Sequence, residues 1–420
     1  MNVINRLPQH VADLIAAGEV VERPASVVKE LFENSVDAGA HSVAVEIKRG
    51  GMGYIRVTDD GKGMSPQDAE TAFLRHATSK LKDEYGLEAI GTLGFRGEAL
   101  AAISAVSRMR LFTRERGSDD GTALVLEAGQ VISREQAGCP EGSTMIAEDL
   151  FYNTPARLKY MKKDQAEGAA VTAAMIRLAL SRPEVSVSYI KDGEEVFHTA
   201  GDGEPLSCIY AVLGRDLAKE LLPVEGSGEG VSVSGFVGAP AAAKGNRSSQ
   251  FFFVNGRCVK SQLLQAALEQ AYKNSLFTGR FPGCVLYLTL KLGAVDVNIH
   301  PAKTEIKFYQ DKQIFDAVYR SVLSALSGER DRPEIKLNGE KERAEKTPAA
   351  AAPAAVSAAG KRPAEAPRTP PEREKENVPP AKMRQIVDQL VFRSNPVRYE
   401  TRTAEEKAPP PARDERSAAA

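Results

Sequence analysis

The sequence has 420 residues, 42% of them hydrophobic and 26% charged, which is enough for two or three domains with sizeable cores. The formal net charge is −1, so no overall field directs the chain to nucleic acid or membrane, and a DNA site would have to be a local basic patch. The four cysteines form no Cys-x-x-Cys pair, which argues against a zinc ribbon and for reduced thiols. Without an apolar leader, and without an apolar run of about 18 residues, we expect a soluble cytoplasmic protein with no membrane partner.

The composition changes sharply near residue 330. Residues 331–420 contain 13 of the 24 prolines but only 2 of the 34 glycines. Alanine- and proline-rich stretches of this kind cannot bury enough apolar surface to offset chain entropy. We therefore expect an ordered region over residues 1–330 and a disordered Pro/Ala-rich tail over 331–420.

An amphipathic helix is predicted from Pro24, because proline is tolerated in a first helical turn and an apolar stripe follows it. Glu30 and Asn34 are four residues apart, so both project from one face of this helix. A carboxylate can accept a proton from an attacking water, and an amide oxygen can join a magnesium shell. An ordinary solvated helix face remains an alternative at this point.

A loop rich in acidic residues and glycine follows two strands that are predicted over residues 41–48 and 54–58. Asp59 at the strand end can accept a hydrogen bond from an exocyclic amine such as that of adenine, and Gly61 and Gly63 allow the backbone to approach a flat ligand. A plain hairpin loop is an alternative. A calcium-binding EF-hand loop is excluded, because Gly61 and Gly63 would occupy two of its ligand positions.

Three glycines, at positions 91, 94 and 97, lead directly into a helix that is predicted over residues 98–106. Amides at such a helix start favour anions, here phosphates, although the signal alone is weak. The segment lacks the Gly-Lys-Ser/Thr of a Walker A loop and the preceding strand of a dinucleotide fingerprint. Antiparallel strands are predicted over 108–149, where Gly142-Ser143-Thr144 could place a hydroxyl near the same ligand as Asp59; a simple strand start is an equal alternative.

Four basic residues with no acid between them precede a helix that is predicted over residues 164–180: Arg157, Lys159, Lys162 and Lys163. They are candidates for contacts with a DNA backbone, and a solvated helix start is an equally good interpretation. A second unit begins near residue 206 with a helix. Its further predicted elements are strands over 231–237, 250–255, 284–292 and 295–299, and helices over 261–276 and 311–327.

These motifs occur in the order of the four ATP motifs of the GHKL superfamily, which comprises gyrase, heat-shock chaperones, histidine kinases and MutL. The motif residues are Glu30…Asn34, Asp59-x-Gly61-x-Gly63, Gly94-Phe95-Arg96-Gly97-Glu98 and Gly142-Ser143-Thr144. The surrounding sequence resembles the DNA mismatch repair family MutL over about residues 1–327. The similar stretches are residues 16–24, 75–80, 151–157 and 296–303, and such long literal matches are highly specific.

The resemblance implies a GHKL (Bergerat-type) α/β sandwich ATPase domain over residues 1–200, followed by a ribosomal-protein-like α/β domain over 206–330. Glu30 would be the general base and Asn34 the Mg²⁺ ligand, while Lys303 would reach the γ-phosphate of ATP. The other residues expected at ATP are Asp59, Gly61, Gly63, Thr78, Ser79, Lys80, Leu93, Gly94, Phe95, Arg96, Gly97 and Thr144. ATP and Mg²⁺ are the implied cofactors.

The implied function is that of a slow, ATP-switched clamp or matchmaker in mismatch repair. It would pass a signal from a MutS-type recognition protein to a downstream nuclease or helicase, bind DNA, form a nucleotide-dependent homodimer and act in the bacterial cytoplasm at the nucleoid. Arg257 and Lys260 match a further family stretch and are DNA candidates, whereas Gln262 stands where a basic residue is expected, which puts the DNA groove in doubt. Family members continue into a dimerisation or endonuclease domain that does not follow residue 330, so we expect a fragment or a truncated product without endonuclease activity.

Three other interpretations compete with this one. A topoisomerase ATPase subunit would continue into a cleavage-reunion or metal-binding domain, and a histidine kinase would carry a phosphoacceptor helix and a membrane span; the sequence contains none of these. A DNA-binding adaptor that uses ATP only to hold its shape would share every motif named above. Hydrolysis by intact protein and by a Glu30→Ala variant separates that adaptor from an ATPase.

Overall fold

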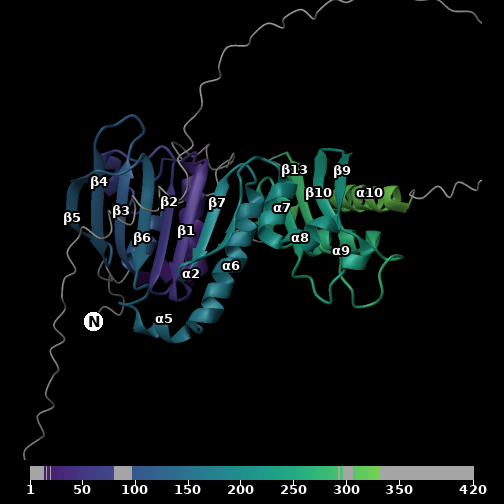
Figure 1. Cartoon of the computed structure of the whole chain (residues 1–420), viewed down its shortest axis with the longest axis horizontal. Coiled ribbons are helices and arrows are strands. Elements are labelled where there is room, and N and C mark those ends of the chain that lie inside the picture. The colour runs from purple at the N-terminus through teal and green to yellow at the C-terminus, as the bar shows by residue number, and fades with distance from the viewer. Residues whose placement is uncertain are drawn as a thin grey trace, which may run out of the picture. The chain divides into compact units, whose positions relative to one another are not determined.

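The computed structural model describes residues 14–15, 17–18, 20–79, 97–291, 294–296 and 306–330 (Figure 1). All of these belong to one compact unit, Met1–Asn338, and a second unit covers Gly339–Ala420. The predicted tail over residues 331–420 lies outside the described residues. The predicted division at residues 200–206 remains a prediction, because the first unit is not divided further.

The first sheet has eight strands in the order β5-β4-β3-β6-β2-β1-β7-β8 (Figure 1). Its strands are β1 (Ser42–Lys48), β2 (Tyr54–Asp59), β3 (Arg108–Arg114), β4 (Gly121–Glu127), β5 (Gln130–Ala137), β6 (Gly142–Glu148), β7 (Ser186–Lys191) and β8 (Glu194–His198). Neighbouring strands are antiparallel except β1 and β7, which are parallel. In β1 every second residue is buried, as the alternation of a strand with one face on a core requires.

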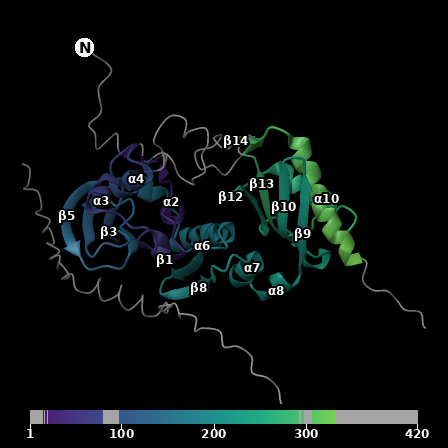
Figure 2. The same cartoon turned by 90° about the horizontal axis from the view of Figure 1, so that it is seen from above.

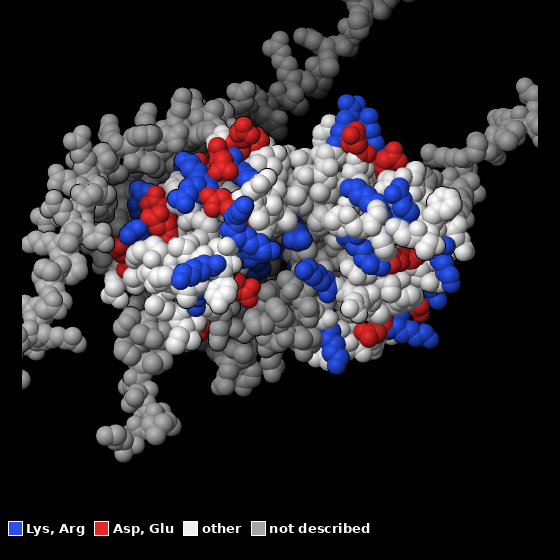
Figure 3. Space-filling view, turned by 90° about the horizontal axis from the view of Figure 1, so that it is seen from below, with Lys and Arg blue, Asp and Glu red and all other residues white. Residues whose placement is uncertain are grey.

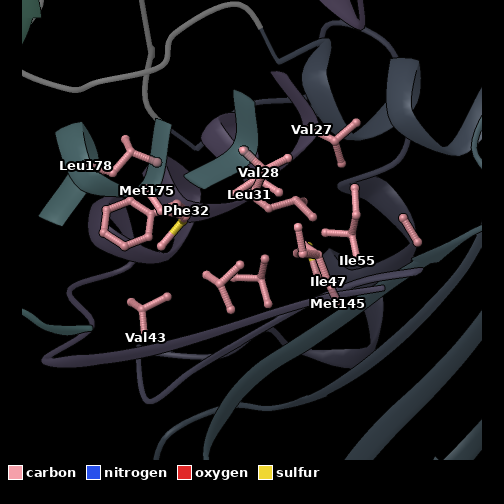
Figure 4. Packing of buried hydrophobic residues seen from close by; sticks show 14 of the residues in the cluster. Val27, Val28, Leu31, Phe32, Val43, Ile47, Ile55, Met145, Met175 and Leu178 are labelled. Atoms are coloured by element: carbon pink, nitrogen blue, oxygen red, sulfur yellow. The ribbon is translucent and has the colours of Figure 1, made fainter. Parts of the chain in front are cut away.

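The helices that accompany this sheet are α2 (Pro24–Asp37), α3 (Pro66–Thr71), α4 (Ala99–Ala105), α5 (Pro155–Tyr160) and α6 (Asp164–Ser181), with a 3₁₀ turn, η1 (Arg49–Gly51). Of these, α2, α3, α4 and α6 pack against its strands. Figure 4 shows Val28 and Leu31 of α2 facing Ile47 and Ile55 of the sheet, with Met175 of α6 beside them. These side chains are fully buried, so the apolar face of α2 points into the core and its opposite face carries the polar residues.

The second sheet has five strands in the order β12-β11-β13-β10-β9. Its strands are β9 (Leu221–Gly228), β10 (Val231–Gly238), β11 (Gln250–Val254), β12 (Arg257–Val259) and β13 (Cys284–Leu290). The remaining elements are α7 (Pro205–Leu213), α8 (Arg215–Lys219), η3 (Pro240–Ala242), α9 (Gln262–Ala271), β14 (Val295–Asp296), β15 (Lys307–Phe308) and α10 (Asp311–Arg330). Helix α10 packs along β9 and β10 and against α9 (Figure 2).

Both sheets with their helices confirm the expected α/β class, but β9 and β12 of the second sheet were not predicted, and α9 ends earlier than expected. The sequence analysis missed β9 because Pro223 and two glycines interrupt its apolar pattern. Proline is tolerated there because β9 is an edge strand. A Cβ at Gly226 would collide with Ser321 of α10, so glycine permits the close approach of that helix. Helix α9 ends at Ala271 rather than near residue 276, and turns that include Ser275 follow it.

Side chains of the second sheet enter the first core. Phe251, Phe253 and Val285 belong to the same buried cluster as the α2 and α6 residues. The Tyr287 hydroxyl donates to the Leu180 carbonyl of α6 at 2.8 Å. The α6 helix is therefore packed against both sheets.

Candidate nucleotide-binding site

A cavity of about 660 Å³ lies beside α2 and the ends of β2 and β6. Glu30 and Asn34 of α2 and Asp59 at the end of β2 all line it. The other residues that line it are Val20, Glu22, Ser26, Lys29, Leu31, Ser35, Asp37, Ala38, Lys62, Gly63, Met64, Asp68, Thr71, Ala72, His76, Ala77, Thr78, Ser79, Gly97, Glu98, Ala99, Leu100, Ser143 and Met145. Segments far apart in the sequence thus converge on one space of a size suited to a small ligand.

Helix α2 positions the two residues that the sequence analysis placed on one face. Pro24 stands in its first turn, its apolar stripe is buried, and Gly39 with φ 75° follows its C-terminal end. Glu30 and Asn34 are half-buried at the cavity wall. The predicted register of the two side chains agrees with the structure.

The Asp59 carboxylate at the cavity accepts three hydrogen bonds from the protein. Its Oδ1 accepts from the amides of Gly61 at 3.0 Å and Ser143 at 3.2 Å, and its Oδ2 accepts from the Ser35 hydroxyl at 2.8 Å. Burial raises the pKa of Asp59, and these three hydrogen bonds oppose the rise. Each carboxylate oxygen can accept about two hydrogen bonds, so Oδ2 retains capacity for one donor from a ligand.

Ser35 is a site residue that sequence reasoning missed. It lies four residues after Leu31 on the buried stripe of α2, and its hydroxyl is in contact with both the Leu31 carbonyl and Asp59. A polar residue at an apolar-stripe position needs a buried partner, and that was the available signal. Ser143 belongs to the predicted Gly142-Ser143-Thr144 stretch, although it was not chosen as the contact within that stretch.

The choice of Thr144 does not agree with the arrangement of β6. Ser143 and Met145 line the cavity, whereas Thr144 does not, because alternate residues of a strand face opposite sides. The Thr144 hydroxyl instead donates to the Thr58 hydroxyl at 3.2 Å. Ser143 therefore replaces Thr144 as the candidate near the ligand.

The glycine predictions have different outcomes. Gly63 and Gly97 line the cavity with φ of 67° and 62°, and a Cβ at either position would collide with the backbone, at Arg114 and Ala77 respectively. Gly61 does not line the cavity; its amide orients Asp59. Glycine at 63 and 97 thus lets two chain segments approach closely at the cavity wall.

The polar segment after α3 reaches the cavity as far as the structure describes it. Thr78 and Ser79 line the cavity, and His76 Nδ1 lies 3.4 Å from Glu98 Oε1 at the beginning of α4. The remaining predicted ATP contacts lie outside the described residues: Lys80, Leu93, Gly94, Phe95, Arg96 and Lys303.

The described residues contain no group of three or more His, Cys, Asp or Glu side chains that could hold a metal ion. The cavity does offer one carboxylate, Glu30, and one amide, Asn34, on a single helical face. These are oxygen donors of the kind Mg²⁺ accepts, and Mg²⁺ commonly takes its other ligands from phosphates and water. The residues present therefore fit a magnesium–nucleotide complex but not an all-protein metal site.

The candidate DNA residues fall into two classes. Lys159, Lys162 and Lys163 at α5 and the start of α6, and Lys260 after β12, are exposed. Arg157 is half-buried and donates to the Leu14 carbonyl at 2.7 Å. Arg257 is half-buried too, and burial lowers its pKa while Glu33 and Asp37 raise it. Figure 3 shows the face seen from below, where Lys and Arg predominate over the centre.

Two family models match the chain. Residues 22–144 match the histidine kinase-, DNA gyrase B- and HSP90-like ATPases, and residues 209–327 match the C-terminal domain of DNA mismatch repair proteins. The first match contains Glu30, Asn34 and Asp59. The GHKL expectation for the first sheet is therefore confirmed.

Two bacterial relatives then narrow the family. The DNA mismatch repair protein MutL of Caldanaerobacter subterraneus subsp. tengcongensis is 46% identical over 337 residues, 80% of this chain and 57% of that protein. MutL of Symbiobacterium thermophilum is 47% identical over 323 residues, 77% of this chain and 51% of that protein. The chain belongs to the MutL family. It spans about half the length of these MutL relatives.

Solved structures agree with the MutL assignment. The ATPase domain of the mismatch repair endonuclease MutL from Aquifex aeolicus is similar with a TM-score of 0.53 and 25% identity, covering 72% of this chain and 99% of that one. The N-terminal domain of a DNA repair protein shares the fold with a TM-score of 0.65 at 23% identity, covering 76% of this chain and 98% of that one. Within the described part of this MutL-family chain, no helix has both the length and the apolarity to cross a bilayer.

Proposed function

We propose that this chain binds ATP in the α2 cavity and hydrolyses it slowly, as the nucleotide-switched part of a mismatch-repair clamp. The observation that carries the proposal is the convergence of Glu30, Asn34 and Asp59 on one cavity. Asp59 has acceptor capacity for an adenine amine, and Glu30 can take a proton from the attacking water. Asn34 would hold Mg²⁺, which neutralises charge on the phosphates when bound.

The test is ATP hydrolysis with and without Mg²⁺ by the intact chain and by a Glu30→Ala variant. The variant should retain nucleotide binding but lose hydrolysis by roughly 10²–10⁴-fold, the range for loss of a general base. Glu194→Ala is the matched control, since Glu194 is an exposed acid on β8. Near-normal turnover in Glu30→Ala would show that another residue activates the water.

The same experiment decides a second candidate, an adaptor that uses ATP only to hold its shape. For an adaptor, single-turnover assays would show binding without hydrolysis in the wild-type chain.

Lys303, which lies outside the described residues, remains proposed at the γ-phosphate. Lys303→Ala should then weaken the binding of ATP more than the binding of ADP. Equal losses of affinity for both nucleotides would place Lys303 away from the γ-phosphate.

The proposed partners are DNA, a MutS-type recognition protein, a downstream nuclease or helicase, and a second copy of the chain that pairs when nucleotide is bound. Sedimentation velocity with a non-hydrolysable ATP analogue tests the pairing, and a stable dimer without nucleotide would contradict it.

For DNA, the exposed lysines are better candidates than Arg157, whose guanidinium is engaged by the Leu14 carbonyl.

A Lys159→Ala/Lys163→Ala variant tests the DNA contact. If both lysines contact phosphates, the plot of log K against log salt should become less steep by roughly 0.9 for each lysine removed. The measurement is fluorescence anisotropy at several salt concentrations. An unchanged slope would place the DNA on another surface.

A further inference from the structure

One ammonium group at the cavity is shared by two carboxylates. Lys29 Nζ lies 3.0 Å from Glu30 Oε1 and 3.1 Å from Glu33 Oε2. Neighbouring residues in a helix do not normally face each other, so the contact between Lys29 and Glu30 is not a consequence of helical spacing. The pair from Lys29 to Glu33 also has the less favourable i,i+4 orientation for a helix surface. The contacts of Lys29 with both acids therefore depend on the surroundings of these side chains and not on helix geometry alone.

Those surroundings strengthen the interaction. The side chains of Lys29, Glu30 and Glu33 are 31%, 26% and 12% exposed. Burial lowers the pKa of Lys29, but Glu30 and Glu33 together raise it above the ordinary value. One permanent positive charge thus serves two acids that compete for it.

We propose that Lys29 is a positioning residue for the Glu30 carboxylate. The inference rests on the proposed ATPase function. A hydrogen bond at Oε1 fixes the otherwise broad terminal torsion of Glu30 and leaves Oε2 to receive the proton of water. The water oxygen then bonds to the γ-phosphorus, and the bond from that phosphorus to the bridging oxygen breaks, with its electron pair leaving on ADP.

The first test replaces the ammonium. Lys29→Met should lower kcat about 10-fold with KM for ATP changed less than about twofold, because misalignment affects the chemical step rather than binding. Lys29→Arg should recover most of kcat, since it restores a donor and a charge. Thermal unfolding of each variant checks that the fold is retained.

The second test concerns the competing acid. Glu33→Gln removes the second carboxylate from Lys29, so kcat should not fall.

The outcomes distinguish this inference from the proposed function. Wild-type hydrolysis by Glu30→Ala would overturn the proposed function itself. Lost hydrolysis in Glu30→Ala together with normal or raised kcat in Lys29→Met would overturn only the positioning role.

Discussion

The two sheets of the described chain bury different kinds of side chain. Among the described residues, nine buried polar or charged side chains belong to the first sheet and its helices, and two belong to the second. The second sheet is covered by α9 and α10 over an apolar cluster. Burying polar groups costs stability unless they are hydrogen-bonded, and two of the nine, Ser35 of α2 and Ser143 of β6, line the cavity and are hydrogen-bonded there.

This comparison predicts that truncation in the second sheet costs stability without changing the site. Leu286→Ala at the centre of β13, where Leu286 is fully buried, should lower the free energy of unfolding by about 2–5 kcal/mol. Urea unfolding measures the loss, and ATP affinity below the transition should be unchanged. Leu323→Ala, at a partly exposed position of α10, is the control, with a change of less than about 1 kcal/mol. A changed ATP affinity in Leu286→Ala would show that the two regions are coupled through the core.

At Asp59 in the first sheet we expect the opposite, a change in ATP affinity without a loss of stability. Asp59→Asn should weaken ATP binding about 10–100-fold, since hydrogen bonds to charged groups contribute about 1.5–3 kcal/mol. Without nucleotide, the variant should be at least as stable as the wild type at pH 7, because burial of the carboxylate charge is removed. Isothermal calorimetry and urea unfolding give the two quantities.

The pH dependence sharpens the same prediction. Burial raises the pKa of Asp59 in the folded protein above the ordinary value of 3.8, so the folded state binds that proton more tightly than the unfolded chain. The contribution of Asp59 to stability therefore falls as the pH rises from about 3.8 through the folded pKa, and is constant above it. The advantage of Asp59→Asn should shrink toward pH 4. A constant difference over this range would contradict the raised pKa.

The sequence predicted most of the first region because its local signals agree with its packing. The apolar stripe of α2 fixed the register of Glu30 and Asn34, and the strand end fixed Asp59. It did not predict Ser143 over Thr144, because the side of the sheet that carries the cavity depends on which helices cover it. Lys29 was missed for a similar reason, since its contact with Glu30 does not follow helical spacing. In the second region β9 was missed because its glycines serve the approach of α10, a contact between distant segments.

The smallest expected effects come from two serine N-caps with the same chemistry in the two regions. Ser261 accepts from the Leu264 amide at 3.3 Å at the start of α9, whose apolar face is buried in the second core. Ser261→Ala should therefore lower the global free energy of unfolding by about 1 kcal/mol. Urea unfolding measures this loss.

Ser65 accepts from the Asp68 amide at 3.1 Å at the start of α3, which has six residues and only Ala69 buried. So short a helix can open without the rest of the sheet, and Ser65→Ala should act locally. Hydrogen exchange over residues 66–71 should speed up about fivefold, since about 1 kcal/mol is lost, while the global unfolding midpoint stays unchanged. Nucleotide should slow this exchange, because Asp68 and Thr71 line the cavity. A global loss equal to that of Ser261→Ala would show that α3 unfolds with the core, and that the first region is as cooperative as the second.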